Sequence, residues 1–292
     1  MNHRAGFVNI LGNPNVGKST IMNALVGEKL SIITSKAQTT RHRIIGIVNG
    51  VDFQIVYSDT PGILKPEYKL QEAMMGFVQG ALIDADVILY VADVRSVPLK
   101  ESEYTEKIKN SGIPVIIAIN KIDLSKQSDL EKIVESWHEV FHDSPIIPVS
   151  GLNKFNLEPL LNAILERLPE GDPYFPKDQL TDKYDRFFAS EIIRGKILTN
   201  YRKEVPYSVE IEIERFREEA SINKISAIIH VMRESQKGII IGHKGSMLKK
   251  VGTEARHEME SFFGKKIFLE MHVKVTKDWR DKPAVLKKFG YR

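Results

Sequence analysis

The eight residues Gly12-Asn-Pro-Asn-Val-Gly-Lys-Ser19 constrain the fold of this chain more than any other stretch. They follow a short apolar run, Phe7–Leu11, and lead into Thr20–Val26, which has the apolar spacing of a helix. A strand, a glycine-rich turn and a helix start are the context in which G-x-x-x-x-G-K-[ST] forms a phosphate-binding loop. The glycines let backbone N–H groups point at phosphate oxygens, and the helix N-terminus adds partial positive charge. In such a loop Lys18 reaches the β- and γ-phosphates and Ser19 binds Mg²⁺.

Residues 1–170 alternate strand-like and helix-like segments, as expected of an α/β domain with a doubly wound, mostly parallel sheet. Lys69–Ile83 and Leu157–Leu168 are examples of the helix-like stretches. Ligands of such sheets bind at the carboxyl ends of the strands, so polar motifs there are candidate site residues. The expected strands are Phe7–Leu11, Ile44–Asn49, Phe53–Ser58, Val87–Asp93, Pro114–Asn120 and Ile146–Val149.

Two polar segments flank the second and third of these strands. Lys36–His42 has no periodicity, and the hydroxyl of Thr40 in it suits a Mg²⁺ shell that is complete only when a γ-phosphate is present. In Asp59-Thr-Pro-Gly62, Asp59 is expected to hold Mg²⁺ through water, and the Gly62 N–H to contact the γ-phosphate. Taken singly, the two segments are equally compatible with a polar loop and an ordinary turn.

Two further strand ends suit a guanine base. In Asn120-Lys-Ile-Asp123, the Asp123 carboxylate accepts the N1–H and the exocyclic amine of guanine, whereas adenine offers neither. Sites built on such polar pairs discriminate by about four to five orders of magnitude. The segment Val149-Ser-Gly151 is expected to bring backbone N–H groups near the guanine O6.

Four motifs in this order resemble the translation-factor-like branch of P-loop GTPases. The pairing of G-x-P-N-V-G-K-S with Gln38–His42 and Asp59–Gly62 resembles, more narrowly, the Era family of bacterial ribosome-assembly GTPases. The chain departs from that family at Gly151, where alanine is usual. The motifs and the resemblance imply catalytic roles for Lys18, Thr40, Asp59 and Gly62, and metal binding by Ser19, Thr40 and Asp59. The implied GTP-binding residues are Gly12, Asn13, Pro14, Asn15, Val16, Gly17, Lys18, Ser19, Thr20, Asp59, Thr60, Pro61, Gly62, Ile63, Asn120, Lys121, Ile122, Asp123, Ser150 and Gly151.

The position after the Asp-x-x-Gly motif holds Ile63, which cannot orient water as the glutamine of many switch GTPases does. No arginine is evidently placed as a finger, although Arg41 and Arg43 lie close in sequence, so slow intrinsic hydrolysis is expected. Asn15 resembles the asparagine with which potassium-activated GTPases hold K⁺ against the phosphates. The other interpretation, that Asn15 only shapes the loop, stays open beside it.

The stretch 171–180, rich in proline, predicts a semi-rigid linker between residues 1–170 and a second domain, 181–292. That domain is expected to start with a helix over Asp182–Thr199, followed by strands over Tyr207–Phe216 and Ile222–Arg233. A G-x-x-G turn, Gly242–Gly245, then precedes an apolar-striped helix and a strand over Ile267–Val275. This order resembles the type II KH domain, an α+β module.

In a KH domain the G-x-x-G turn clamps about four nucleotides by their backbone, beside an apolar groove that receives the bases. The implied RNA-binding residues are Ile241, Gly242, His243, Lys244, Gly245, Lys249 and Lys250, with Lys265, Lys266, Lys274 and Lys277 extending the basic surface. Residues 181–292 carry a charge of +8, from 24 Lys+Arg and 16 Asp+Glu, whereas residues 1–180 carry −4. This asymmetry favours a polyanionic partner for the second domain. The alternative is a KH fold kept only for docking a protein.

Residues His138-Glu-Val-Phe-His142 match H-E-x-x-H, the pattern of zinc peptidases. The stretch closes an expected helix, and Val140 and Phe141 are better interpreted as core contacts of that helix. The absence of cysteine excludes disulfides and thiolate metal sites, and favours a reducing cytoplasm. No apolar run approaches the roughly 20 residues of a membrane span, and the start leaves no room for a signal peptide.

The resemblance to the Era family extends over nearly the whole chain. It implies a GTP-hydrolysing switch that uses Mg²⁺, binds the 3′-terminal region of small-subunit ribosomal RNA and assists assembly of the small ribosomal subunit. The alternative is a peripheral membrane signalling GTPase whose basic domain meets anionic lipid at the inner face of the cell membrane. A third hypothesis is the zinc peptidase. Nothing in the sequence indicates an obligate oligomer.

Overall fold

The computed structural model describes residues 3–96 and 103–291 of the 292-residue chain. It divides into two compact units. The first unit comprises residues 1–31, 40–65 and 74–182, and the second comprises residues 32–39, 66–73 and 183–292. Residues 32–39 and 66–73, from the N-terminal half of the chain, therefore belong to the second unit. The domains expected from sequence, 1–170 and 181–292, did not separate these two segments from the first domain.

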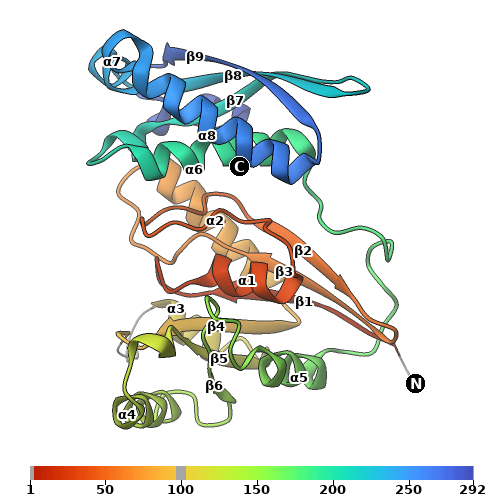
Figure 1. Cartoon of the computed structure of the whole chain (residues 1–292). Helices are drawn as coiled ribbons and strands as arrows, with labels where there is room; N and C mark the ends of the chain where they lie inside the picture. The colour runs from red at the N-terminus through yellow and green to blue at the C-terminus, as the bar shows by residue number, and fades with distance from the viewer. Residues whose placement is uncertain (1–2, 97–102, 292) are drawn as a thin grey trace. The chain divides into compact units, whose positions relative to one another are not determined.

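The first unit contains a six-stranded sheet (Figure 1) in the order β2-β3-β1-β4-β5-β6. All neighbouring strands are parallel except β2 and β3, so the doubly wound, mostly parallel sheet is confirmed. The central strands are buried on both faces, which explains why they appear in the sequence as continuous apolar runs. The strands are β1 (Arg4–Leu11), β2 (Ile44–Asn49), β3 (Phe53–Asp59), β4 (Val87–Asp93), β5 (Val115–Asn120) and β6 (Ile146–Pro148).

The helices of the first unit follow these strands along the chain. Helix α1 begins at Lys18, directly after the glycine-rich loop, with Gly17 in a left-handed conformation (φ 97°) before it. Among the described residues no helix is long and apolar enough to cross a bilayer. The helices are α1 (Lys18–Val26), α2 (Lys69–Ile83), α3 (Glu103–Lys109), α4 (Gln127–His138) and α5 (Leu157–Arg167).

The proline-rich stretch expected to be a linker lies against the first unit. Gln54 exchanges two hydrogen bonds with the backbone of Phe175, at 2.8 and 2.9 Å. The Ile47 N–H donates to the carbonyl of Leu180 at 2.8 Å, and the Thr181 hydroxyl donates to Ile45 at 2.6 Å. The stretch thus covers the outer edge of β2 and satisfies backbone groups that an open edge strand exposes.

The second unit is an α+β arrangement around the three-stranded sheet β7-β8-β9 (Figure 1). The two expected strands, β7 and β8, form an antiparallel hairpin, and β9 lies parallel to β8. The apolar faces of α6 and α8 pack on this sheet, with Ile193, Val251 and Met259 fully buried. The elements are α6 (Asp185–Asn200), β7 (Glu210–Glu218), β8 (Ile222–Val231), α7 (Glu234–Ile241), α8 (Ser246–Phe263), β9 (Lys266–Val275) and α9 (Pro283–Lys288).

Candidate nucleotide site and nucleic-acid interface

The loop between β1 and α1 has the backbone that a phosphate cradle requires. Gly12 has φ 144°, and a Cβ atom there would lie 2.1 Å from the carbonyl oxygen of Val91, so only glycine fits. The buried Lys18 ammonium donates to the carbonyls of Gly12 (3.0 Å) and Asn13 (2.9 Å). Burial lowers the pKa of Lys18 to about 8, against the opposing effect of Asp59. A cation whose charge is weakly solvated therefore lies where phosphates are expected.

Three oxygen-bearing side chains from three separate segments converge beside Lys18. The Ser19 hydroxyl donates to Asp59 Oδ2 at 2.7 Å, and Thr40 Oγ1 lies 2.9 Å from Ser19 Oγ and 3.2 Å from the same carboxylate oxygen. Asp59 Oδ1 is buried and has no hydrogen-bond partner among the described residues. Burial raises the pKa of Asp59 more than Lys18 and the hydroxyls of Ser19 and Thr40 lower it, so a further cation at this carboxylate would favour its ionised form.

This trio fits Mg²⁺, which prefers oxygen ligands such as hydroxyls, carboxylates and water. Within residues 3–96 and 103–291, no group of three or more His, Asp or Glu side chains suits a metal ion. The trio of Ser19, Thr40 and Asp59 is a candidate Mg²⁺ site because its oxygens converge beside Lys18.

The segment that follows β3 lies against the phosphate loop. A Cβ atom at Gly62 would be 2.7 Å from Pro14 Cα, so glycine is required for the close approach of the two backbones. The Ile63 N–H donates to the Gly12 carbonyl at 3.1 Å, and the Thr60 hydroxyl donates to Ile10 at 2.7 Å. These contacts bring the predicted γ-phosphate-sensing residues to the edge of the loop.

The residues predicted to bind the base form a connected frame. Asn120 Nδ2 donates to the Val16 carbonyl at 2.8 Å, and Asn120 Oδ1 accepts the Gly151 N–H at 2.9 Å. The Ser150 hydroxyl donates to Asp123 Oδ1 at 2.6 Å. Ser150 therefore orients the exposed carboxylate that is expected to select guanine.

The backbone N–H groups of Ser150 and Gly151, which are expected to lie near the guanine O6, have hydrogen-bond partners within the protein. The Ser150 N–H donates to the carbonyl of Phe155 at 3.2 Å, and the Gly151 N–H is taken by Asn120. A Cβ atom at Gly151 would lie 3.0 Å from Ile21 Cγ1, so an alanine here would press on helix α1. The small residue keeps the frame close to that helix.

Sequence reasoning missed one residue of this frame, Asp93. Its Oδ2 accepts from Lys121 Nζ at 3.0 Å, and the same ammonium donates to the carbonyl of Asn15. Burial opposes ionisation of Asp93, but Lys121 and neighbouring donors lower its pKa. Asp93 pairs with Asn120 in the register of β4 and β5. In the sequence, a carboxylate at the end of an expected strand was the feature that could have identified Asp93 as a site residue.

Asn15 itself is exposed and has a left-handed backbone (φ 63°), a conformation that asparagine tolerates better than most residues. The remaining predicted GTP-binding residues lie in the same segments around β1, β3 and β5. They are Asn13, Pro14, Val16, Gly17, Thr20, Pro61 and Ile122.

The H-E-x-x-H match does not form a zinc-peptidase helix. Helix α4 ends at His138, so His142 lies beyond it and the two histidines do not share a helical turn. Phe141 is buried and stacks near Trp137, with ring centroids 6.2 Å apart, as the core interpretation expects. The stretch belongs to the packing of the first unit.

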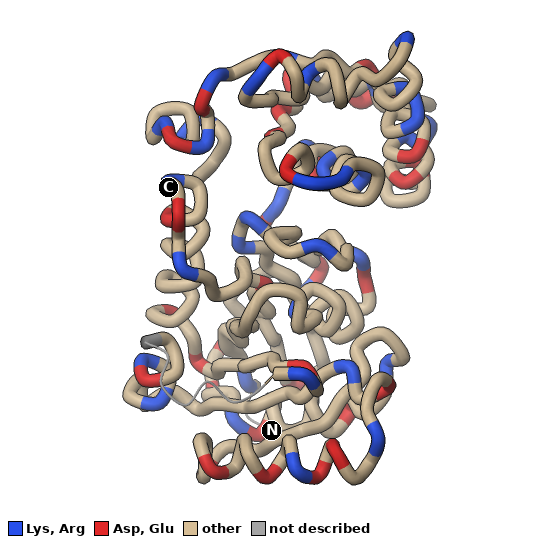
Figure 2. Tube along the Cα trace, turned by 90° about the vertical axis from the view of Figure 1, so that its left-hand side faces the viewer, with Lys and Arg blue, Asp and Glu red and all other residues tan. Residues whose placement is uncertain are grey.

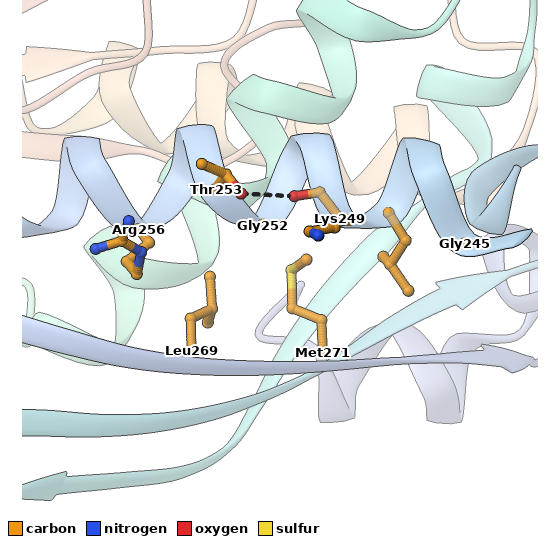
Figure 3. Close-up of a pocket in the computed structure, with 8 residues that line it drawn as sticks. Gly245, Lys249, Gly252, Thr253, Arg256, Leu269 and Met271 are labelled. Carbon is orange, nitrogen blue, oxygen red and sulfur yellow. Dashed lines mark hydrogen bonds between the residues drawn. The ribbon is translucent and has the colours of Figure 1, made fainter.

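In the second unit, the G-x-x-G turn joins α7 to α8. Gly242 (φ 71°), Lys244 (φ 50°) and Gly245 (φ 78°) all have positive φ, which keeps the turn tight and its backbone accessible. Beside it lies a groove of about 380 Å³ between α8 and β9 (Figure 3). The groove is lined by Gly245, Leu248, Lys249, Gly252, Thr253, Arg256, Leu269 and Met271.

Leu269 and Met271 project from β9 toward α8, while Lys249 and Arg256 come from the helix (Figure 3). An apolar floor with basic groups beside it suits stacked bases and their phosphates. Of the predicted RNA-binding residues, Gly245 and Lys249 line the groove, and Ile241, Gly242, His243 and Lys244 form the adjoining turn. Lys250 does not line the groove, and its Nζ lies 3.9 Å from Glu254 Oε1. The sequence did not point to Thr253, Arg256, Leu269 and Met271, although their helical and alternating spacings put them on two facing surfaces.

Comparison with known proteins agrees with both units. Residues 7–121 match the family described as 50S ribosome-binding GTPase, and residues 204–280 match the KH domain. GTPase Era of Syntrophus aciditrophicus is 44% identical, covering 99% of this chain and 95% of that protein. GTPase Era of Clostridium kluyveri is 42% identical, covering 99% of both proteins.

Two solved structures superpose on almost the whole chain, each with a TM-score of 0.95, 40% identity and 99% coverage of both chains. One is an Aquifex aeolicus Era variant bound to GDP.AlF4⁻, and the other is Era in complex with MgGDPNP and nucleotides 1506–1542 of 16S ribosomal RNA. Together with the phosphate loop and the groove beside the G-x-x-G turn, these matches show that the chain belongs to the Era family of GTPases, enzymes that hydrolyse GTP.

Proposed function

We propose that this GTPase is a Mg²⁺-dependent switch that binds the 3′-terminal region of small-subunit ribosomal RNA and assists assembly of the small ribosomal subunit in the cytoplasm. The observation that carries the RNA part is the apolar groove beside the G-x-x-G turn, with Lys249 and Arg256 among its lining residues. The Era structure that holds nucleotides 1506–1542 of 16S ribosomal RNA supports the same choice of RNA.

In the first unit, we propose that Lys18 and the backbone of the glycine-rich loop bind the β- and γ-phosphates. A Mg²⁺ ion at Ser19, Thr40 and Asp59 neutralises phosphate charge when bound. Water attacks the γ-phosphorus, the bond to the β-phosphate oxygen breaks, and GDP and phosphate result. Asp123, held by Ser150, reads the guanine edge.

In the second unit, the positive-φ turn Gly242–Gly245 lets the RNA backbone approach closely, and Lys244 neutralises a phosphate. Bases then enter the groove and pack against the apolar side chains of Leu269 and Met271. The charge of this region agrees with an anionic partner: lysine and arginine (blue in Figure 2) outnumber acidic residues by 24 to 16 in residues 181–292. These phosphate contacts weaken with salt.

The test compares RNA with lipid, since a peripheral membrane GTPase is the competing function. The wild-type chain and His243→Asp/Lys244→Asp are titrated with an RNA of nucleotides 1506–1542 and with vesicles of anionic phospholipid at the same salt. We expect the wild type to prefer the RNA, and the double variant to lose at least about tenfold in RNA affinity because two contacts to phosphate are replaced by repulsion.

A matched control makes the same charge change elsewhere. Gln127→Asp/Lys132→Asp alters two exposed residues of α4 and should bind the RNA as the wild type does. Equal binding of wild type and double variant to the RNA would reject the G-x-x-G turn as part of the RNA site. Binding to the vesicles with no preference for the RNA would favour the membrane function.

We also propose that K⁺ at Asn15 accelerates hydrolysis. Ile63 offers no hydrogen bond to the attacking water, so additional positive charge at the phosphates is needed from another source.

A further inference from the structure

Lys121 lies across the phosphate loop, within the first unit. Its backbone is left-handed (φ 64°), and its ammonium donates to the carbonyl of Asn15. A Cβ atom at Gly17 would lie 4.0 Å from Lys121 Cε, so the aliphatic part of the side chain runs close to the loop. The neighbouring Asn120 donates to the next carbonyl of the loop, that of Val16, at 2.8 Å. Two consecutive residues therefore hold two consecutive carbonyls of the loop.

Asp93, at the end of β4, is the second partner of the Lys121 ammonium. Asp93 Oδ2 accepts from Lys121 Nζ at 3.0 Å, and the two side chains are 11% and 25% exposed. The other carboxylate oxygen, Oδ1, accepts from the Arg95 N–H at 2.9 Å and from the Ser96 hydroxyl at 3.1 Å. Burial raises the pKa of Asp93, but Lys121 and these donors outweigh it and lower that pKa below its ordinary value. The carboxylate is therefore ionised and held at both oxygens.

The strands that carry this ion pair are joined without it. Strands β4 and β5 pair through their backbones as far as Asp93 and Asn120, and the Val94 N–H then donates to the Asn120 carbonyl at 3.2 Å. The ion pair adds the placement of the ammonium. Because a lysine side chain is a flexible four-carbon stem, a fixed carboxylate on one side and a loop carbonyl on the other restrict where its charge lies.

We propose that Asp93 is a positioning residue for nucleotide binding: it holds the Lys121 ammonium against the Asn15 carbonyl, and so keeps Lys121 and the phosphate loop ordered before the nucleotide arrives. The inference rests on the proposed nucleotide-binding role of Lys121. A site that is already ordered loses less conformational entropy when its ligand binds, which raises affinity. The hydrogen bonds of this ion pair join it to the loop at Asn15 and not to the proposed Mg²⁺ ligands, so GDP and a GTP analogue should gain equally.

A double-mutant cycle tests whether Asp93 acts through Lys121. Asp93→Asn keeps the shape of the side chain and removes its charge, Lys121→Met keeps the stem and removes the ammonium, and a third variant carries both changes. Arg95→Met is the matched control, because the Arg95 guanidinium lies 3.6 Å from Asp93 Oδ2 on a side chain that is 69% exposed. This substitution keeps the backbone N–H that donates to Asp93, so it should leave nucleotide affinity unchanged.

For each full-length variant we measure the unfolding temperature and the affinities for GDP and for the GTP analogue GDPNP, both with Mg²⁺. We expect Asp93→Asn to weaken the binding of both nucleotides by about tenfold, the effect of one lost charge-assisted hydrogen bond. In the Lys121→Met background, Asp93→Asn should change neither affinity further, because the group through which it acts is gone.

Equal losses from Asp93→Asn in both backgrounds would indicate a purely structural role and reject the positioning role. A loss confined to GDPNP would place the effect at the γ-phosphate and reject it as well. Ser96→Ala carries the same test if Asp93→Asn does not fold, since it keeps the ion pair and removes one donor that orients the carboxylate. A smaller loss for both nucleotides, about threefold, supports the positioning role, and wild-type affinity rejects it.

Lys121→Met separates this inference from the function on which it rests. If Lys121→Met weakens the binding of both nucleotides while folded Asp93→Asn matches the Arg95→Met control, the positioning role is rejected and the role of Lys121 stands. If Lys121→Met binds both nucleotides as the wild type does, the proposed role of Lys121 fails, and the positioning role fails with it.

Discussion

We propose that guanine selectivity rests on Asp123, whose carboxylate accepts a hydrogen bond from the Ser150 hydroxyl at 2.6 Å. Asp123→Asn exchanges an acceptor for a group that also donates, so the preference should move from GTP toward xanthosine triphosphate. We expect GTP affinity to fall at least about a hundredfold, because sites built on such polar pairs discriminate strongly. Competition between the two nucleotides measures the change, and unaltered GTP affinity would mean that the base lies elsewhere.

Lys18 makes GTP binding depend on pH. Its pKa in the free protein is about 8, below the ordinary 10.5, because burial penalises the ammonium. Bound phosphates favour the ammonium and raise this pKa again, so binding takes up a proton where free Lys18 has lost one. GTP affinity should therefore be flat below pH 8 and fall above it, approaching tenfold per pH unit.

Isothermal titration at pH 8.5 in two buffers with different ionisation enthalpies measures that proton directly. Uptake of a proton agrees with this account. Binding without proton uptake at pH 8.5 would contradict the lowered pKa of Lys18 in the free protein.

A substitution of Asn15 distinguishes a cation site from a loop-shaping role, provided that the new residue can adopt its φ of 63°. Asn15→Ala strains the backbone there, whereas Asn15→Gly removes the side-chain amide and keeps the left-handed conformation accessible. If K⁺ binds at Asn15, hydrolysis by the wild type should be faster in potassium than in sodium chloride, and Asn15→Gly should lose the difference. Equal wild-type rates in both salts would remove the cation from the mechanism.

At the scale of the elements, apolar runs predicted strands of the first unit such as β4, which is buried throughout, and the alternation of polar and apolar residues predicted β7. These patterns did not predict that residues 171–182 cover the edge of β2, since hydrogen bonds such as that of Ile47 to Leu180 join residues distant in sequence. The hydrogen bond from Arg194 to the Thr39 carbonyl could not be predicted either: Arg194 lies 155 residues away, and its burial is a tertiary property.

For the candidate site, each motif could be placed at a strand end from sequence because parallel strands bring their carboxyl ends to one edge. The hydrogen-bond partner of each backbone N–H could not be predicted from sequence. The Gly151 N–H, for example, donates to Asn120 Oδ1. The groove residues on β9 were also missed, because an alternating strand such as Lys266–Val275 does not reveal which of its faces meets a ligand.

The segment after β9 was not foreseen and gives an element-scale prediction. Trp279 is fully buried, and its Nε1–H donates to the Ser208 carbonyl at 3.0 Å. Trp279→Ala should destabilise the second unit by about 3–5 kcal/mol through the lost packing. Trp279→Phe keeps most of the ring and should cost about 1–3 kcal/mol for the carbonyl that loses its partner. Urea unfolding followed by circular dichroism compares the two, and equal losses would contradict the packing argument.

At the scale of the whole molecule, charge and chemistry are divided between the two halves of the sequence. Residues 1–180 carry −4 and hold the nucleotide motifs, whereas residues 181–292 carry +8 and hold the KH groove. We propose that the acidic half with the phosphate loop binds GTP and that the basic half with the apolar groove binds RNA, through separate sets of residues.

The most direct test of this account is one set of titrations, with GTP and with the RNA of nucleotides 1506–1542, on Asp123→Asn and on His243→Asp/Lys244→Asp at one salt concentration. We predict that Asp123→Asn loses GTP affinity but, with no nucleotide present, binds the RNA as the wild type does. The double variant should lose RNA affinity and keep its affinity for GTP. A folded double variant that still binds the RNA like the wild type, or that loses GTP and RNA together, would contradict the assignment of the two ligands to separate residues.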